Sequence, residues 1–121
     1  ATTISALNGT DPITLTKQSA AKAWINFNGT GTASIRDSIN VASLVDRGTG
    51  LYTVNYTSSM SSADYSSTGS CADNATDATA RNRMVTPSTL TASASYANTF
   101  HTGGVADDVQ LVCVSIHGDL A

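Results

Sequence analysis

Apolar and polar side chains alternate in short stretches along the chain, and one clear stretch covers residues 22–27. Ala23, Ile25 and Phe27 fall on one face, and Trp24 and Asn26 fall on the other. This is the period-two pattern of a β-strand. Residues 28–31, Asn-Gly-Thr-Gly, follow directly. Asn-Gly is typical of tight hairpin turns because both positions adopt positive φ angles. The pattern predicts a hairpin whose return strand begins near Thr32.

The strand pattern continues toward the middle of the chain. The return strand places Ile35 on the inward side, and a bulge near residues 37–38 is expected to rotate Asp37 outward, after which Ile39 and Val41 resume the apolar phase. Residues 41–45 predict a short strand. The two glycines within residues 46–50 predict a turn after it.

The most regular alternation covers residues 51–57, where Tyr52, Val54 and Tyr56 share one face. Residues 89–96 alternate in the same way, with leucine, alanine and tyrosine on one face and threonine and serine on the other. Both segments are predicted as strands because period two and β-branched or aromatic residues favour a pleated, half-buried chain.

Three other segments are less regular. Residues 58–70 are mostly serine, and a further strand could begin at 63–65. Residues 73–83 lack proline and glycine and suit either a short helix or an irregular loop. Residues 109–117 are apolar on both faces, so this strand must be covered on one side by a second sheet and on the other by a loop or another subunit.

About seven short strands separated by turns, without a convincing long helix, predict an all-β fold. The expected architecture is an antiparallel β-sandwich of jelly-roll-like or immunoglobulin-like type. A single domain is expected over residues 22–121, because 121 residues are the length of one domain. Residues 1–21 carry a weak pattern and are interpreted either as an arm that attaches to another surface or as a frayed terminus.

The amino-acid composition supports the all-β prediction and argues against some classes of binding partner. The chain has no glutamate, and serine and threonine make up more than a quarter of it. Serine and threonine favour caps, turns and strands over helix interiors. The net charge of −3 gives no basic face to displace counterions from nucleic acid. No apolar run approaches the roughly 20 residues that span a bilayer. Neither nucleic acid nor a membrane is an expected partner.

The chain has two cysteines, Cys71 and Cys113. They lack the spacing of a metal-binding or redox pair. Either they form a disulfide or they are buried as small apolar side chains, and Cys113 falls in a strand pattern that buries it in either case.

Four stretches of the sequence resemble a known type of module. They are KAWINFNGTGT at 22–32, IRDSINV at 35–41, DRGTGLYTVNY at 46–56 and VCVSIHG at 112–118. This pattern resembles a β module of bacteriophage and prophage tail-fibre and other virion-surface proteins. The resemblance covers roughly the first half and the last ten residues, whereas residues 66–104 match nothing in it.

The resemblance implies an oligomeric, often trimeric, all-β protein on the exterior of a phage particle. Its partners would be further copies of itself and other virion proteins, such as major capsid or tail proteins. Such modules occur at several places on a virion, so the resemblance alone leaves the place open.

The sequence contains no convincing catalytic or metal-binding constellation. His101, His117, the aspartates and the many hydroxyls could be combined into several Ser-His-Asp sets, and nothing selects one of them. Asp73 and Asp77 lack the spacing and glutamate of an EF-hand, so a solvated loop is the favoured interpretation. Two histidines and two cysteines far apart make a weak zinc site. We therefore expect a non-enzymatic protein with no metal and no cofactor.

Two sets of residues are singled out for binding. The residues expected at a self-association interface are Trp24, Val112, Val114 and Ile116. The aromatic residues that could stack on a sugar are Trp24, Tyr52 and Tyr56, because an aromatic face offers apolar contacts to a pyranose ring.

The favoured function is that of a capsid decoration, cement or head-fibre-like protein, because the chain is too short to include a fibre shaft. The alternative is the tip module of a tail fibre or tail spike that binds a host-surface glycan. A weaker alternative is a carbohydrate-binding accessory module of an enzyme.

Overall fold

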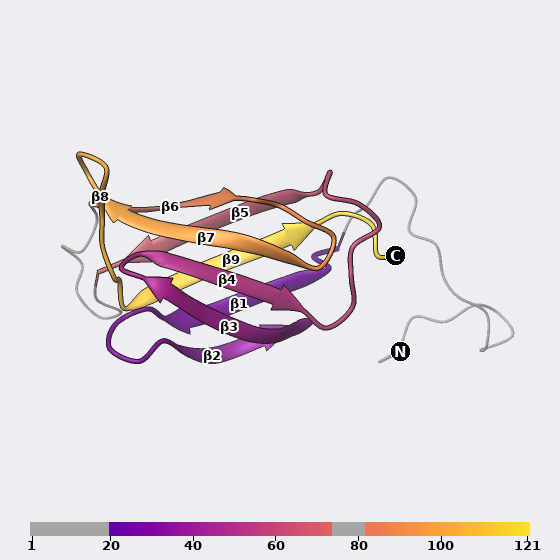
Figure 1. Ribbon diagram of the computed structural model, residues 1–121, viewed down its shortest axis with the longest axis horizontal. Helices are drawn as coiled ribbons and strands as arrows, with labels where there is room; N and C mark the ends of the chain where they lie inside the picture. Colours follow the sequence, from indigo (N-terminus) through magenta and orange to yellow (C-terminus); the bar gives the residue numbers. More distant parts are fainter. Residues whose placement is uncertain (1–19, 74–81) are drawn as a thin grey trace, which may run out of the picture.

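The computed structural model describes residues 20–73 and 82–121 (Figure 1). Within these ranges the chain forms strands and turns and no helix. The strands are β1 (Ala23–Asn28), β2 (Ser34–Ile39), β3 (Val41–Gly48), β4 (Leu51–Tyr56), β5 (Ser66–Ala72), β6 (Arg83–Ser88), β7 (Ala94–His101), β8 (Val105–Ala106) and β9 (Leu111–His117). All their pairings are antiparallel. The prediction of an all-β, antiparallel fold is confirmed.

Two sheets pack face to face. One has the strand order β2–β1–β9–β5, and the other has the order β3–β4–β7–β6 with β8 paired to β7. Phe27 of β1 and Tyr52 of β4 meet between the sheets, with ring centroids 4.9 Å apart in an edge-to-face arrangement. The buried apolar residues are Ala23, Ile25, Phe27, Tyr52, Val54, Tyr56, Met60, Tyr65, Ala97, Val109, Val112, Val114 and Ile116. They form one core between the two layers, as in a β-sandwich.

The predicted first hairpin is present, but its turn differs from the prediction, because β2 begins at Ser34 and neither Asn28 nor Gly29 has a positive φ. The Thr30 amide donates a hydrogen bond to Asn28 Oδ1 (2.9 Å), and Gly31 has a φ of 62°. Asn26 pairs with Asp37 and Phe27 pairs with Ile35, so Arg36 is the extra residue of a bulge in β2. The predicted bulge is confirmed one residue earlier than expected, and Asp37 lies on the outward side.

The bulge also changes the orientation of Ile39. Ile39 pairs with the outward-facing Trp24 and is 53% exposed. The expectation that Ile39 resumes the inward phase is therefore wrong. A bulge shifts the phase of every later residue in its strand, so Asp37 and Ile39 turn outward together.

Asn40 carries the chain from one sheet to the other. It is the only residue between β2 and β3, and its φ is 57°, a left-handed conformation that asparagine tolerates better than most residues. Its side-chain oxygen accepts a hydrogen bond from the Ser58 amide (2.7 Å), and its Nδ2 donates to the Ser58 carbonyl oxygen (3.0 Å). These bonds fix the corner that places β2 and β3 at the same side of the sandwich.

The strand predicted over residues 89–96 is wrong in position and in phase. The strand here is β7, which begins at Ala94, and Thr89 has a φ of 47° before it. Ser95, Ala97 and Thr99 face the core, whereas Tyr96 faces outward beneath the Arg47 guanidinium, whose Cζ is 3.7 Å from the ring centroid. Hydroxyl side chains occupy inward positions here, which a hydrophobicity pattern does not reveal.

The sequence pattern did not predict strands in the segments that form β5 and β6. Both are edge strands of their sheets, and their side chains are mainly polar. Residues 1–19 of the predicted arm and residues 74–81 of the predicted helix or loop lie outside the described residues.

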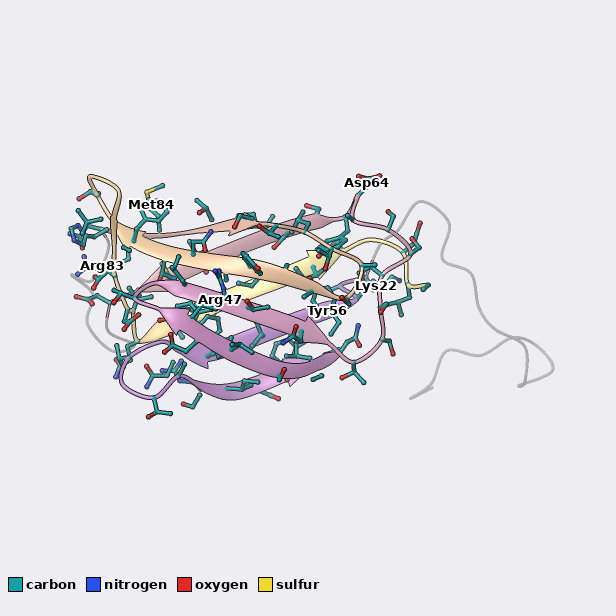
Figure 2. The ribbon with its side chains drawn as sticks, in the orientation of Figure 1. Lys22, Arg47, Tyr56, Asp64, Arg83 and Met84 are labelled. Carbon is teal, nitrogen blue, oxygen red and sulfur yellow. The ribbon has the colours of Figure 1, made fainter. Side chains whose placement is uncertain are left out.

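The described chain begins and ends at the same end of the sandwich (Figure 1). The Lys22 amide donates to the Ile116 carbonyl oxygen (2.8 Å), and the Ala121 amide donates to that of Ser59 (3.0 Å). Figure 2 shows Lys22 near this end and Arg83 near the opposite end. The β1–β2 and β3–β4 turns lie at the opposite end.

Candidate functional site

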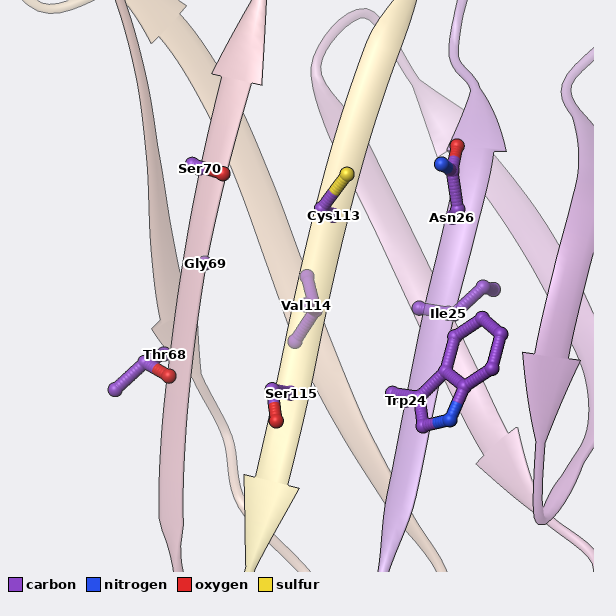
Figure 3. Close-up of a pocket in the computed structure, with 9 residues that line it drawn as sticks. All are labelled: Trp24, Ile25, Asn26, Thr68, Gly69, Ser70, Cys113, Val114 and Ser115. Atoms are coloured by element: carbon purple, nitrogen blue, oxygen red, sulfur yellow. The ribbon is translucent and has the colours of Figure 1, made fainter. Parts of the chain in front are cut away.

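A shallow depression lies on the outer face of the β2–β1–β9–β5 sheet. It has a volume of about 520 Å³ and spans β5, β9 and β1 (Figure 3). Its outward-facing residues are Trp24, Asn26, Thr68, Ser70, Cys113 and Ser115, and Ile25, Gly69 and Val114 complete the lining. The half-buried indole of Trp24 is the one aromatic ring of this lining.

Strand register brings these residues together from distant parts of the chain. Trp24 lies between Ile39 of β2 and Ser115 of β9, and Ser115 is opposite Thr68 of β5. In the next row Asn26 is opposite Cys113, which is opposite Ser70. Side chains directly opposite one another in antiparallel strands lie on the same face. Two cross-strand rows therefore build the depression.

Three hydroxyl side chains line this depression. Within the described residues, the side chains of Thr68, Ser70 and Ser115 make no hydrogen bond, and neither does the indole N–H of Trp24. Each hydroxyl can donate one hydrogen bond and accept two. The depression thus presents several free donors and acceptors around one aromatic ring.

Asn26 is held in place by a neighbouring cation. Arg36 Nη1 donates to Asn26 Oδ1 (3.2 Å), and Arg36 Nη2 donates to the Gln110 carbonyl oxygen (2.7 Å). With Oδ1 engaged, the amide NH2 of Asn26 remains as a donor. No charged side chain is among the lining residues.

Two of the three predicted ligand aromatics are in the core, so those predictions are wrong. Tyr52 is fully buried, and its hydroxyl oxygen lies 2.8 Å from the Gly29 carbonyl oxygen and 2.8 Å from Asp108 Oδ1, the two acceptors for its single proton. Burial and the bond to Asp108 raise the pKa of this phenol. The Tyr52 side chain links the two sheets and cannot stack on an external ligand.

Tyr56 is buried in a second network of hydroxyls. Its hydroxyl lies 2.9 Å from Ser95 Oγ and 3.1 Å from the hydroxyl of Tyr65. Tyr65 in turn donates to the carbonyl oxygens of Thr91 (2.9 Å) and Ala94 (3.0 Å). Burial raises the pKa of Tyr65. Both rings are internal structural groups.

Three of the four predicted self-association residues are also in the core of their own chain. Val112 is 0% exposed, and Val114 and Ile116 alternate with it along β9 toward the opposite sheet. Their assignment to an interface between copies is wrong. The outward face of β9 consists of Leu111, Cys113, Ser115 and His117, all half-buried. Of the predicted interface and ligand residues, Trp24 alone lies on the surface.

The two cysteines are free and lie on opposite faces of one sheet. Cys71 packs against the core, whereas Cys113 lines the outer depression. Burial raises the pKa of the Cys71 thiol, which disfavours its thiolate. The sequence did not decide between a disulfide and two free cysteines, and in the structure the two cysteines are not bonded to each other.

The acidic and histidine residues that were considered as metal ligands are separated or paired. Arg83 Nη2 lies 3.0 Å from Asp73 Oδ2, and Arg83 Nε lies 2.8 Å from Asp107 Oδ2. Asp77 lies outside the described residues. His101 ends β7 and His117 ends β9, at opposite ends of the sandwich (Figure 1). In the described ranges no three metal-binding side chains converge.

The chain was compared with family models, with curated proteins and with solved structures, and none of the three comparisons gave a match. In the part of the chain that the structure describes, no helix is long and apolar enough to cross a bilayer.

Proposed function

We propose that this protein is a non-enzymatic structural module on the exterior of a bacteriophage particle, of the capsid decoration, cement or head-fibre type. The sequence stretches that carry the resemblance form the β1–β2 hairpin, the Asn40 corner, the β3–β4 hairpin and β9. They make up a continuous part of the scaffold. A module held at the end where the described chain begins and ends would present the opposite loops outward.

The observation that carries this proposal is the composition of the β2–β3 side of the sandwich. Both strands are at the edges of their sheets and are largely exposed, yet Ile35 is 38% exposed and Val45 is 44% exposed. Soluble proteins usually protect edge strands with charges, bulges, proline or a covering segment. Here β2 has a bulge, and each strand carries one cation and one anion beside its exposed aliphatic side chains, Arg36 and Asp37 on β2 and Asp46 and Arg47 on β3. Two adjacent edges with exposed aliphatic side chains suit pairing with further copies of the chain.

We accordingly place self-association, as a trimer, at the β2–β3 side. Strand edges offer unpaired N–H and C=O groups, and the exposed aliphatic side chains add apolar area to be buried. Each contact is weak, but many copies on a symmetric shell raise the effective concentration and the total affinity. This surface replaces Val112, Val114 and Ile116 as the interface.

Antibody labelling of purified virions tests the location. Hundreds of copies over the head are expected for a decoration protein. A few copies on the tail would support the alternative instead, and virions without label would contradict both.

The second candidate function is the tip module of a tail fibre or tail spike that binds a host-surface receptor. The depression around Trp24 favours it, because a concave face with free hydrogen-bonding groups suits a ligand. A carbohydrate-binding accessory module of an enzyme would use the same face.

A further inference from the structure

We propose that the depression around Trp24 is a binding site for the neutral sugar units of a glycan. This inference rests on the receptor-binding candidate function and gives it a ligand class. It concerns the chain by itself, so it is tested separately from the place of the protein on a virion.

The Trp24 indole supplies the stacking surface. Its neighbours in register, Ile39 and Ser115, flank it on the adjacent strands, and it is half-buried. A ring held in this way loses little conformational freedom on binding. The apolar C–H face of a pyranose can pack on it, as aromatic rings commonly do with apolar surface.

The hydroxyls supply the directional contacts. Thr68, Ser70 and Ser115 have no side-chain partner within the described residues, and Asn26 keeps its NH2 group free. Hydroxyls both donate and accept, so they match the hydroxyls of a sugar in either sense. Two cross-strand rows present these groups to one side of the ring, with Ser115 on β9 and Thr68 and Ser70 on β5 (Figure 3).

Charge and size restrict the ligand. No charged side chain lines the depression. The Arg36 guanidinium beside it is hydrogen-bonded to Asn26 and to the Gln110 carbonyl oxygen, and Asp37 lies opposite Asn26. The two charges next to the site therefore offset each other and favour a neutral sugar over an acidic sugar or a phosphate. The volume of about 520 Å³ lies within the roughly 300–1,000 Å³ typical of small-molecule sites. The depression is shallow, so we expect weak binding, with a Kd on the order of 1 mM or above for one sugar unit.

A second copy of the chain is the competing occupant of this face. The exposed aliphatic side chains of the β2–β3 side make a better interface, because burying the hydroxyls of Thr68, Ser70 and Ser115 without partners would oppose association. The depression is therefore assigned to a ligand rich in hydroxyls.

The chain has a single tryptophan, so its signals report this site directly. The full chain is titrated with glucose, galactose, mannose, N-acetylglucosamine and N-acetylgalactosamine, with glucuronic acid as the charged comparison. The readouts are Trp24 fluorescence and the NMR signal of its indole N–H. We expect a saturable change with at least one neutral sugar and a weaker response to glucuronic acid.

Two variants test the hydrogen bonds while keeping the shape of the site. Ser115→Ala and Thr68→Val should each weaken binding roughly 3- to 10-fold. Thr86→Val, on the exposed outer face of β6, is the matched control and should leave binding unchanged. The mass of Trp24→Ala in solution should equal that of the wild type.

Three results would overturn the proposal. The first is that none of the neutral sugars shifts either signal. The second is that glucuronic acid binds as tightly as the best neutral sugar. The third is that Trp24→Ala lowers the oligomer mass, which would assign the face to a second copy.

Discussion

At the scale of single residues, Tyr52 and the turns that it contacts hold one end of the sandwich together. Its hydroxyl reaches the turn after β1 through the Gly29 carbonyl oxygen and the segment before β9 through Asp108. Asp108 Oδ1 also accepts a hydrogen bond from the Gly50 amide (2.8 Å) in the β3–β4 turn. Three turns far apart in sequence thus meet at one buried phenol.

Gly29 is needed for this close approach. A Cβ atom at this position would lie 2.5 Å from Tyr52 Oη and 2.8 Å from the Val109 carbonyl oxygen. We expect Gly29→Ala to lower the free energy of unfolding by about 1–3 kcal/mol, as overpacking does. Urea denaturation measures this. Gly31→Asn is the control, because Gly31 has open space around it and a φ that asparagine tolerates; equal losses for the two variants would contradict the assignment.

The buried phenols also predict an alkaline limit to stability. Burial raises the pKa of Tyr52 and Tyr65 above the ordinary 10.0. Above about pH 10 the unfolded chain loses phenolic protons that the folded chain keeps, so the unfolded state gains stability. The free energy of unfolding should be level below pH 10 and then fall, by at most about 1.4 kcal/mol per pH unit for each tyrosine. Urea titrations across this range measure it, and a level profile would show that these phenols ionise normally.

At the scale of strands, the sequence pattern predicted the strands whose inward-facing side chains are apolar. β1 and β4 alternate as expected, and a hairpin follows β1, although its turn is longer than the predicted Asn-Gly turn and has its positive φ at Gly31. The sequence could not show which face of β7 is inward, because the polar side chains of Ser95 and Thr99 are buried and hydrogen-bonded. Ser95 bonds to Tyr56, 39 residues away in sequence, and Thr99 bonds to the Asp107 carbonyl oxygen across the loop that follows β7.

Thr99 allows this explanation to be tested. Its Oγ1 donates to the Asp107 carbonyl oxygen at 2.6 Å. Thr99→Val keeps the shape but leaves that oxygen without its donor, so the free energy of unfolding should fall by about 1–3 kcal/mol. Thr57→Val, at an exposed position, should change it by no more than about 0.5 kcal/mol. A tolerated Thr99→Val would mean that the hydroxyl is dispensable.

At the scale of the whole molecule, the candidate site depends on topology more than on any local motif. The alternation in β1 predicted that Trp24 faces away from the core, and it does. β9 is apolar on both faces, so its pattern could not tell which face meets the other sheet. Thr68 and Ser115 join Trp24 only because β5, β9 and β1 are neighbours in one sheet. No single segment of sequence carries that information.

The placement of the cysteines gives a prediction at the same scale. Cys71 and Cys113 lie on opposite faces of the sheet, so both thiols should remain free in the purified protein. Alkylation of the unfolded chain without reductant should label both cysteines, as measured by mass spectrometry. A chain that takes up label only after reduction would contradict the described packing of β5.

The β2–β3 side predicts how the oligomer can be broken. Val45→Asp places a charge on an exposed edge and should convert the proposed trimer to monomer, because burying an unpaired charge opposes association. Val105→Asp is the matched control, since Val105 is 56% exposed on β8 and lies outside this side of the sandwich. Light scattering measures both masses. Trimers in both variants would move the interface elsewhere.

In the proposed oligomer, other copies of the chain cover the exposed edge strands β2 and β3. The most direct test is the mass of the wild-type chain by light scattering over a range of concentrations. The account predicts a rise to three times the 12.4 kDa of one chain. A mass that stays at 12.4 kDa up to the highest concentration would contradict it.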